Sequence, residues 1–552
     1  MGRDHFFVAF ISLLLAVMLL SIPGSAQQSC ESLATLRVPH VTVSLAQSIA
    51  AGTFTVPPPP EGKGEPVDLP GFCRVTGISQ PVEDSEIRFE LWMPTKDWNG
   101  RLQQEGNGGY AGAIPYQSMI PALREGFATV ATDDGHVGPG HPAWAIGHPQ
   151  KVIDFGYRAV HDTAENAKLI VRAFYGHAQR HSYFVGCSDG GREGLMEAQR
   201  FPNDFDGISV GAPGDNWTRL FAAAFPWNEN AILDNPASYI PESKLPVIQA
   251  GALAACDALD GVKDGIIADP RNCHFDPAVL ECKGTDTTGC LTRAQVEAAR
   301  KIYQGPKTLK TGEQIYPGVE PGDEAGHEGW NWITGSGPKL AKQYLYAHSF
   351  LADMVHEDPK WNLTSYDPDK DVKLADSKLG PILNSTNPDL RSFKSRGGKL
   401  IQFHGWADYV VPPRDSINYY ESVVRVMGGD RSTIDFYRLF MVPGFEHCGG
   451  GPGPTTFIGS FQFPPTLDAA ERNAVRGDAE HNMILALVRW VEDGISPDRI
   501  IATKYVDNKP MKGVDRTWLL CPYPDAGHWS GKGNPNDSTN YACRPPSPVR
   551  KP

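Results

Sequence analysis

The sequence contains no long run of lysine or arginine. Its 552 residues carry 51 basic and 64 acidic side chains, for a formal net charge of −13 at pH 7. Without a basic patch there is no electrostatic footprint for a nucleic acid or for an anionic membrane surface. The composition therefore favours a small molecule as the partner, and nothing in it implies a protein partner.

Long apolar runs are scarce as well, because the only one lies over residues 6–20. No other segment approaches the ~18 consecutive apolar residues that mark a membrane-spanning helix. The run follows Arg3 and precedes the small residues of positions 21–26, as in a signal peptide. We predict that residues 1–26 are a cleaved signal, that no membrane span is left after cleavage, and that the protein is secreted or periplasmic. An uncleaved anchor is the alternative.

The sequence also lacks a CxxC pair accompanied by a pair of histidines, so a zinc site is not indicated. It has ten cysteines, all after the predicted cleavage point. An even number of cysteines in an exported chain favours disulfides, with buried free thiols as the alternative. The residues alone do not fix the pairing, because ten cysteines combine in many ways.

Strand and helix patterns alternate along the chain, which is typical of an α/β fold. Apolar side chains recur at helical spacing before Gly176, which stands where a C-terminal cap is expected. The predicted strands are residues 86–92, 126–132, 181–185, 205–213, 399–403 and 433–437, and the predicted helices are residues 161–175, 193–200 and 483–491.

A nucleophile motif lies between one of these strands and the next helix. Gly-Cys-Ser-Asp-Gly at residues 186–190 matches G-x-S-x-G in the strand-turn-helix context that the motif requires. We predict Ser188 as the nucleophile. The backbone N–H of Asp189 would point at the developing oxyanion, aided by the N-terminus of the helix. A plain glycine-rich turn is the alternative.

A nucleophilic serine needs a histidine base and a carboxylate that orients the base, and in this type of fold they follow in the order Ser, Asp, His. Asp408 comes just after the strand at residues 399–403, and His447 lies in a glycine-bounded loop after the next strand. We predict these two as orienting acid and base. A turn-capping aspartate and a surface histidine are the alternatives, and His404 is a rival base.

Two cysteines tie the predicted base to the nucleophile. Cys187 immediately precedes Ser188, and Cys448 immediately follows His447. If the serine and histidine are within hydrogen-bond reach, the cysteines fall within the Cα separation of ~4.4–6.8 Å that a disulfide demands. Neither motif requires a neighbouring cysteine, so this agreement is the most specific signal in the sequence.

These motifs predict an α/β-hydrolase core. Between residues 215 and 392 the pattern changes to irregular stretches rich in Trp, Pro and Asp. We therefore predict core segments at residues 27–214 and 393–552, with an inserted lid domain at residues 215–392. Residues 27–85 are expected to form an irregular entry segment.

The segments at residues 99–112, 187–201, 205–208 and 211–213, with the loops of Asp408 and His447, resemble the tannase/feruloyl esterase family. The resemblance implies hydrolysis of esters of aromatic acids, with Ser188, Asp408 and His447 as the triad. It implies a second oxyanion N–H in the turn at residues 106–109, which we place at Gly108 rather than Gly109. It also implies five disulfides: Cys30–Cys73, Cys187–Cys448, Cys256–Cys273, Cys282–Cys290 and Cys521–Cys543.

A loop within the predicted lid has several carboxylates close together. Asp257, Asp260 and Asp264 lie on a glycine-rich loop bounded by two cysteines. Several carboxylates and carbonyls on one tight loop suit a hard Ca²⁺ ion, although the spacing is not that of an EF-hand. An Asp-Gly turn is the alternative. The resemblance implies a structural Ca²⁺ site with ligands from Asp257, Asp260, Asp264 and the carbonyls of Val262 and Ile266.

The predicted substrate is a small aromatic ester, and the sequence leaves its acyl group open among galloyl, feruloyl, caffeoyl and terephthaloyl. We predict that His404 and Trp406 contact it, because they are beside Asp408. The lid aromatics Trp330, Trp332 and Phe350 either stack on the acyl group or serve packing. A substrate with a free carboxylate would need an Arg or Lys in the pocket, and the sequence places none there.

Two other functions remain open at this stage. An acyl-enzyme intercepted by an alcohol would make the protein an acyltransferase, and loss of catalysis would leave an exported polyphenol- or carbohydrate-binding protein. No redox or nucleotide cofactor is implied.

Overall fold

The computed structural model describes residues 28–58, 63–138, 140–285, 287–458, 469–475 and 477–545. The predicted signal peptide lies outside the described residues. Within the described part, none of the helices combines the length and the apolarity that a membrane span demands.

The centre of the fold is a nine-stranded mixed sheet. Strands β6 to β11 run parallel to one another. Strands β1, β4 and β5 extend this sheet at one edge by antiparallel pairing. The strands in sheet order are β1 (Val41–Ile49), β4 (Phe72–Ser79), β5 (Ile87–Pro94), β7 (Ala128–Thr132), β6 (Arg101–Glu105), β8 (His181–Cys187), β9 (Gly207–Gly211), β10 (Lys399–Gly405) and β11 (Tyr437–Val442). Three short pairs lie outside it: β2 (Gly52–Thr55) with β3 (Pro66–Leu69), β12 (Ile500–Tyr505) with β13 (Val514–Leu520), and β14 (Ala526–Trp529) with β15 (Tyr541–Arg544).

Helices cover both faces of the sheet, so the parallel strands are largely buried, although β6 buries the polar residues Gln103, Gln104 and Glu105. The core on one face includes residues of α3, α4 and α14, and the core on the other includes residues of α1 and α17. The helices are α1 (Tyr116–Arg124), α2 (Pro149–Ile153), α3 (Ala159–Tyr175), α4 (Asp189–Arg200), α5 (Trp217–Arg219), α6 (Phe225–Leu233), α7 (Leu245–Cys256), α8 (Arg293–Gln304), α9 (Asn331–Thr334), α10 (Lys342–Ser349), α11 (Pro368–Lys378), α12 (Gly380–Leu383), α13 (Arg391–Ser395), α14 (Arg414–Val426), α15 (Asp430–Ile434), α16 (Ala469–Ala474) and α17 (Met483–Asp493).

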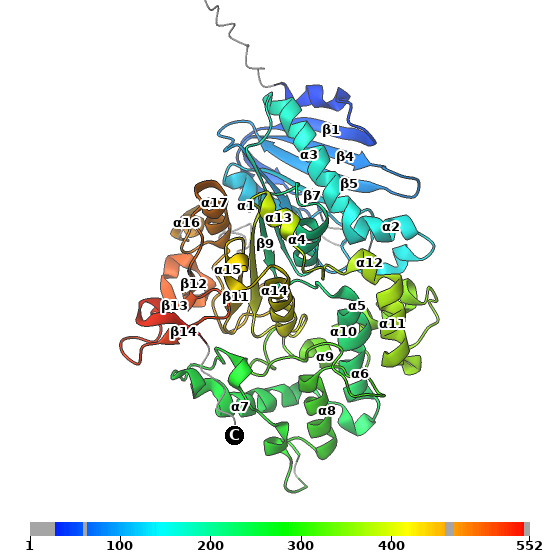
Figure 1. The fold of residues 1–552 in the computed structure, drawn as a ribbon, viewed down its shortest axis with the longest axis vertical. Coiled ribbons are helices and arrows are strands. Elements are labelled where there is room, and N and C mark those ends of the chain that lie inside the picture. Colours follow the sequence, from blue (N-terminus) through cyan, green and yellow to red (C-terminus); the bar gives the residue numbers. More distant parts are fainter. Residues whose placement is uncertain are drawn as a thin grey trace, which may run out of the picture.

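The long connection from β9 to β10 carries helices α5 to α13. In Figure 1 the helices α6 to α9 lie at one end of the molecule and the N-terminal strands β1, β4 and β5 at the other, with β9 and β11 between them. Helices α6 to α9 of this connection thus lie beyond the sheet, whereas α13 packs on the sheet beside α4. This arrangement is that of an α/β hydrolase with an elaborate insertion.

Two expectations need correction. The entry segment is not irregular throughout, because β1 pairs with β4, with one irregularity between Val43 and Leu45, and both belong to the main sheet. The disulfide Cys30–Cys73 anchors the preceding short helix to β4. The strand expected at residues 433–437 begins only at Tyr437, because Thr433 belongs to α15 and its hydroxyl donates to the carbonyl of Gly429. The apolar run that fills the sheet continues to Val442 instead.

Candidate active site

Ser188 occupies a sharp turn between β8 and α4. Its backbone has φ 65° and ψ −118°, a strained conformation for a residue with a side chain and one that clusters at functional sites. The turn needs its glycines, because a Cβ on Gly186 would lie 2.5 Å from the carbonyl oxygen of Gly190, and one on Gly190 2.9 Å from that of Asn107. The G-x-S-x-G pattern therefore follows from backbone crowding at this turn.

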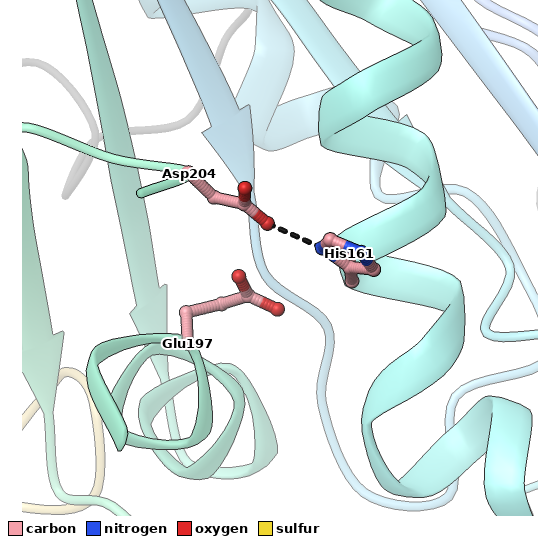
Figure 2. A group of neighbouring side chains, drawn as sticks. All are labelled: His161, Glu197 and Asp204. Atoms are coloured by element: carbon pink, nitrogen blue, oxygen red, sulfur yellow. Dashed lines mark hydrogen bonds and ion pairs between the residues drawn. The ribbon is translucent and has the colours of Figure 1, made fainter. Parts of the chain in front are cut away.

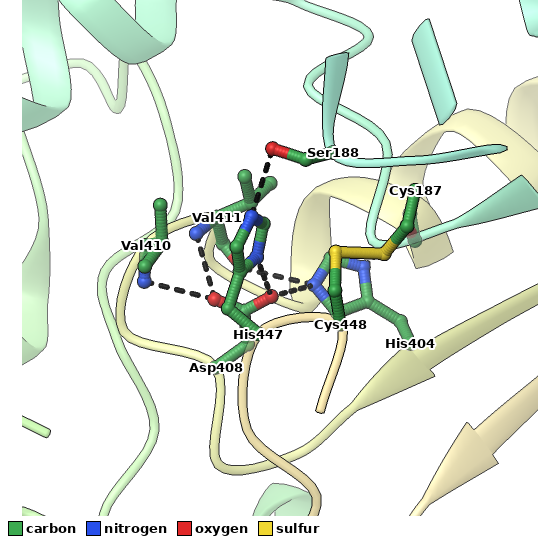
Figure 3. The surroundings of a disulfide bond; sticks show 9 residues. Cys187, Ser188, His404, Asp408, Val410, Val411, His447 and Cys448 are labelled. Carbon is green, nitrogen blue, oxygen red and sulfur yellow. Dashed lines mark hydrogen bonds and ion pairs between the residues drawn. A yellow bond between two sulfur atoms is a disulfide. The ribbon is translucent and has the colours of Figure 1, made fainter. Parts of the chain in front are cut away.

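Ser188, His447 and Asp408 form one continuous chain of hydrogen bonds (Figure 3). Nε2 of His447 lies 2.8 Å from Oγ of Ser188, and Nδ1 lies 2.7 Å from Oδ2 of Asp408. The three side chains follow the ends of three strands in the parallel part of the sheet, β8, β10 and β11, and β9 lies between β8 and β10. This geometry lets His447 take the serine proton while Asp408 fixes the ring and its tautomer.

Asp408 is fully buried, yet its carboxylate is well supplied with donors. The N–H groups of Val410 and Val411 each donate to Oδ1 at 2.8 Å. Burial alone would raise the pKa of Asp408, but His447 and His404 outweigh it and hold that pKa well below its usual range. For His447, burial opposes the charged form, and the carboxylate of Asp408 outweighs it and raises the pKa of the ring. Asp408 is thus a fixed negative charge beside the base.

The disulfide Cys187–Cys448 joins the two loops that carry serine and histidine. The cysteines are 261 residues apart in sequence, and their Cα atoms are 6.0 Å apart. In Figure 3 the sulfur bridge lies directly beside the hydrogen-bonded chain. The other eight cysteines form the four pairs that the resemblance implies, Cys30–Cys73, Cys256–Cys273, Cys282–Cys290 and Cys521–Cys543.

The two predicted oxyanion donors, the N–H groups of Asp189 and Gly108, lie on two segments that hydrogen bonds join to each other. The N–H of Asp189 is in the first turn of α4, where it has no acceptor within the helix. Gly108 lines the same pocket as Ser188, and its loop is fixed because Asn107 donates its N–H to Glu193 at 3.0 Å and accepts the N–H of Gly190 at 2.9 Å. Both segments thus border the space beside the serine hydroxyl.

The side chain of Asp189 has a contact that the sequence did not reveal. It is fully buried and accepts a hydrogen bond of 2.6 Å from Nε of Arg192, whose other nitrogens donate to the carbonyls of Phe155 and Gly156. Burial raises the pKa of Asp189 to about 7, against the opposing effect of Arg192. Asp189 therefore anchors the start of α4 as well as offering its backbone N–H.

A pocket of about 470 Å³ opens beside Ser188. One side is formed by the nucleophile turn, the loop at Gly108, His447 and Val411, and the other by side chains of the connection between β9 and β10. The latter are mostly aromatic and include Trp217, Phe221, Phe225, Trp332 and Tyr346. Trp332 and Tyr346 lie with their rings stacked, 6.2 Å between centroids. Such a pocket suits a flat aromatic group.

Comparisons with known proteins agree with this site. The family model for tannase and feruloyl esterase matches residues 73–544. The chain belongs to the tannase and feruloyl esterase family. An uncharacterized esterase of Xanthomonas campestris pv. campestris is 42% identical over 96% of this chain and 93% of its own length. A probable feruloyl esterase B-2 of Aspergillus terreus is 31% identical over 98% of this chain and all of its own length. The crystal structure of feruloyl esterase B from Aspergillus oryzae superposes with a TM-score of 0.85, at 29% identity over 94% of this chain and all of that one.

This protein is therefore a carboxylic ester hydrolase of the tannase and feruloyl esterase type, on an α/β-hydrolase core. The family membership covers most of the chain, as the sequence motifs predicted.

The structure corrects the predicted substrate contacts. His404 is fully buried, and its ring bonds Oγ of Ser416 at 2.7 Å, the carbonyl of Val411 at 2.9 Å and Asp408 at 3.1 Å. Trp406 is buried too and lines a separate small cavity of about 60 Å³, where Arg271 lies over its ring. Neither residue lines the pocket at Ser188. His404 contacts the same oxygen of Asp408, Oδ2, that His447 contacts.

The lid aromatics divide between the two expected roles. Trp332 lines the pocket, whereas Trp330 and Phe350 are fully buried in packing, against Tyr303 and Phe221 respectively. The pocket residues Trp217, Phe221, Tyr346 and Glu328 were missed, because no motif marks them and they lie far from Ser188 in the sequence.

In the expected calcium loop, Asp257, Asp260 and Asp264 each accept backbone N–H groups of the loop, and in the described part of the chain their oxygens are not gathered in one tight cluster. The disulfide Cys256–Cys273 closes the loop, and burial, followed by the charges of Asp264 and Asp257, raises the pKa of Asp260 to about 6. Within the described residues, the backbone carbonyls of Val262 and Ile266 accept no hydrogen bond. The three carboxylates and the two carbonyls without donors supply oxygens of the kind that a hard cation takes. One oxygen of Asp264 also contacts Arg516 of β13.

A second group of ionisable side chains lies between α3 and α4, apart from the pocket lining (Figure 2). Nδ1 of His161 is 2.5 Å from Oδ2 of Asp204, and Lys168 approaches the other oxygen at 3.4 Å. Glu197 faces this pair, and burial together with Asp204 raises its pKa well above the ordinary value. Burial thus favours the neutral form of Glu197, while His161 and Lys168 favour the ionised form of Asp204, so we interpret the group as part of the packing of α3 against α4.

Proposed function

We propose that this esterase is an exported enzyme that cleaves esters of aromatic acids through an acyl-enzyme on Ser188. The observation that carries the proposal is the unbroken chain of hydrogen bonds from Ser188 through His447 to Asp408. The serine end of this chain opens into a pocket that is lined by aromatic rings. The names of the relatives, which include feruloyl esterases, support the choice of aromatic acids.

The proposed reaction has two halves. His447 takes the proton of Ser188 as the serine oxygen attacks the ester carbonyl, and the N–H groups of Asp189 and Gly108 hold the resulting oxyanion. His447 then gives its proton to the departing alcohol. Water, deprotonated by His447, attacks the acyl-enzyme and releases the acid, which restores the serine.

Export is supported by the disulfides and by the predicted signal. Five disulfides join all ten cysteines, and such bonds persist in oxidising compartments outside the cytoplasm. The apolar run at residues 6–20 followed by small residues has the pattern of a secretory signal.

We also propose that the loop at residues 257–266 binds a structural Ca²⁺ ion. Asp257, Asp260, Asp264 and the carbonyls of Val262 and Ile266 would supply the oxygens. The loop does not line the pocket at Ser188, so the ion would stabilise the lid and take no part in the chemistry.

The experiment that tests the function compares wild type with Ser188→Ala on a panel of esters. The panel is methyl gallate, methyl ferulate, chlorogenic acid, mono(2-hydroxyethyl) terephthalate and p-nitrophenyl acetate. Loss of the nucleophile should lower kcat by roughly 10³-fold or more, since only binding and the oxyanion donors remain. Ser209→Ala is the matched control, because Ser209 is a buried serine on the neighbouring strand β9 and should keep near wild-type rates.

Each contrary outcome has a distinct meaning. Cleavage of p-nitrophenyl acetate alone would place the acyl specificity outside aromatic acids. A folded wild type that cleaves nothing and resists a fluorophosphonate probe would instead point to a binding protein. Ester products formed from an added alcohol, in excess over the free acid, would indicate an acyltransferase.

A further inference from the structure

The pocket beside Ser188 contains a carboxylate that the acyl-transfer steps do not use. Among the described residues that line it, Glu328 is the sole acidic side chain, and none is a lysine or an arginine. The carboxylate of Glu328 has no hydrogen-bond donor and no ion-pair partner in the described part of the chain. It is therefore free to act on whatever enters the pocket.

Glu328 is held close to the catalytic histidine. Its backbone N–H donates to Oε1 of Glu446 at 3.2 Å, and Glu446 immediately precedes His447. Burial has the largest effect on Glu328 and raises its pKa, whereas the nearby His447 favours its charged form, and Glu328 in turn favours the charged form of the histidine. A substrate ester that reaches Ser188 must therefore pass within the field of this carboxylate.

Other charges near the pocket do not cancel this field. Asp408 carries a charge of the same sign as Glu328 and does not line the pocket. Lys342 is exposed, and its ammonium lies over the ring of Trp332 at 4.4 Å without lining the pocket. A solvated ammonium is screened by water and salt, whereas a half-buried carboxylate beside aromatic walls is screened less.

We propose that Glu328 is a specificity-determining residue that makes the enzyme select neutral aromatic esters over esters that carry an ionised carboxylate. The inference rests on the proposed function and narrows it. An anionic substrate would be repelled by Glu328 and would find no Arg or Lys among the lining residues to pair with. Terephthalate monoesters are thus disfavoured, whereas alkyl esters of uncharged phenolic acids are accepted.

The test uses two substrates that share the aromatic ring and the scissile methyl ester and differ in charge. They are dimethyl terephthalate, which is neutral, and monomethyl terephthalate, which is an anion at neutral pH. We expect kcat/KM of wild type to be at least about tenfold higher on the neutral diester. In Glu328→Gln, removal of the negative charge should reduce this ratio by roughly tenfold, chiefly through faster cleavage of the anion.

Two control variants separate charge from shape. Glu328→Asp keeps the charge and should keep the wild-type ratio, and Glu313→Gln makes the same chemical change at an exposed position outside the pocket and should leave the ratio unaltered. A wild type that cleaves both esters equally well would overturn the inference. So would an equal change of the ratio in the Asp and Gln variants, because shape would then be the cause.

Failure of the proposed function gives a different result. In that case wild type would cleave neither terephthalate ester nor methyl ferulate. A Glu328→Gln variant whose active site is misfolded would label Ser188 with an uncharged fluorophosphonate more slowly than wild type does. The labelling rate of Glu328→Asp is measured beside it for comparison.

Discussion

The two walls of the pocket are built in different ways. On the core side, Ser188, His447 and Asp408 stand at strand ends, and a disulfide joins two of their loops. The other wall belongs to the connection between β9 and β10, and we call it the lid wall. Large rings such as Trp217 and Trp332 line it together with the carboxylate of Glu328. The core wall depends on directional hydrogen bonds, whereas the lid wall depends on shape and charge. Chemistry and selection are thus assigned to different parts of the chain.

After loss of the nucleophile itself, the largest effect on the core wall should come from removal of its disulfide. Cys187→Ala combined with Cys448→Ala frees the serine loop from the histidine loop, so kcat should fall roughly 10- to 100-fold as the Ser188 to His447 hydrogen bond loosens. The free energy of unfolding should fall by about 2–5 kcal/mol. Steady-state rates on methyl ferulate and thermal unfolding measure the two effects.

A second pair of cysteines gives the matched control. Cys282→Ala with Cys290→Ala opens a short lid loop between residues only eight apart, so it should leave kcat within about twofold. If the variant without Cys187 and Cys448 also kept full kcat, the disulfide would not be positioning the two loops.

Sequence reasoning located the core wall far better than the lid wall. Ser188, Asp408 and His447 were found because acyl transfer needs those residue types in that order, and each lies in a short, recognisable loop. His404 and Trp406 were misplaced because closeness to Asp408 in sequence does not say which way a side chain points. Gln402 and His404 alternate on β10 with Phe403 and both bond Ser416 of α14, so they face away from the pocket.

The lid wall gave no comparable signal. One group of its rings lies on residues 217–225 and the other on α9 and α10. The two groups are separated by about a hundred residues of sequence and meet only through packing. Glu328 is one of 64 acidic residues in the sequence, and only the fold distinguishes it from the rest. Burial and contact between distant segments, not residue type, decide membership of this wall.

The pH dependence of activity should reveal how the lid wall acts on the core wall. Burial disfavours the charged ring of His447, but Asp408 and then Glu328 outweigh it, so its pKa is raised from 6.5. The base works only when neutral, so kcat/KM should rise from acid pH with a midpoint above pH 6.5 and fall about tenfold per unit below it. Profiles on uncharged methyl ferulate measure this midpoint.

The variant Glu328→Gln tests the link between the two walls. It removes a charge that favours protonated His447, so the midpoint should move to lower pH, while Glu313→Gln should leave it in place. A wild-type midpoint at or below pH 6.5, or no shift in the glutamine variant, would contradict the electrostatic connection.

The smallest effect on catalysis should come from the calcium loop, because it lies outside the pocket. Asp260→Asn, or removal of divalent ions by a chelator, should lower Tm by roughly 5 °C, since a ligand that binds only the folded state stabilises it. The kcat of the protein that stays folded should change by less than about twofold. Asp276→Asn is the control, because this lid carboxylate pairs with Arg300 outside the loop and its loss should not alter the response to Ca²⁺. If added Ca²⁺ raised the Tm of wild type and of Asp260→Asn equally, or of neither, the loop would not be the binding site, and the aspartates would be serving only the turn that their side chains bond.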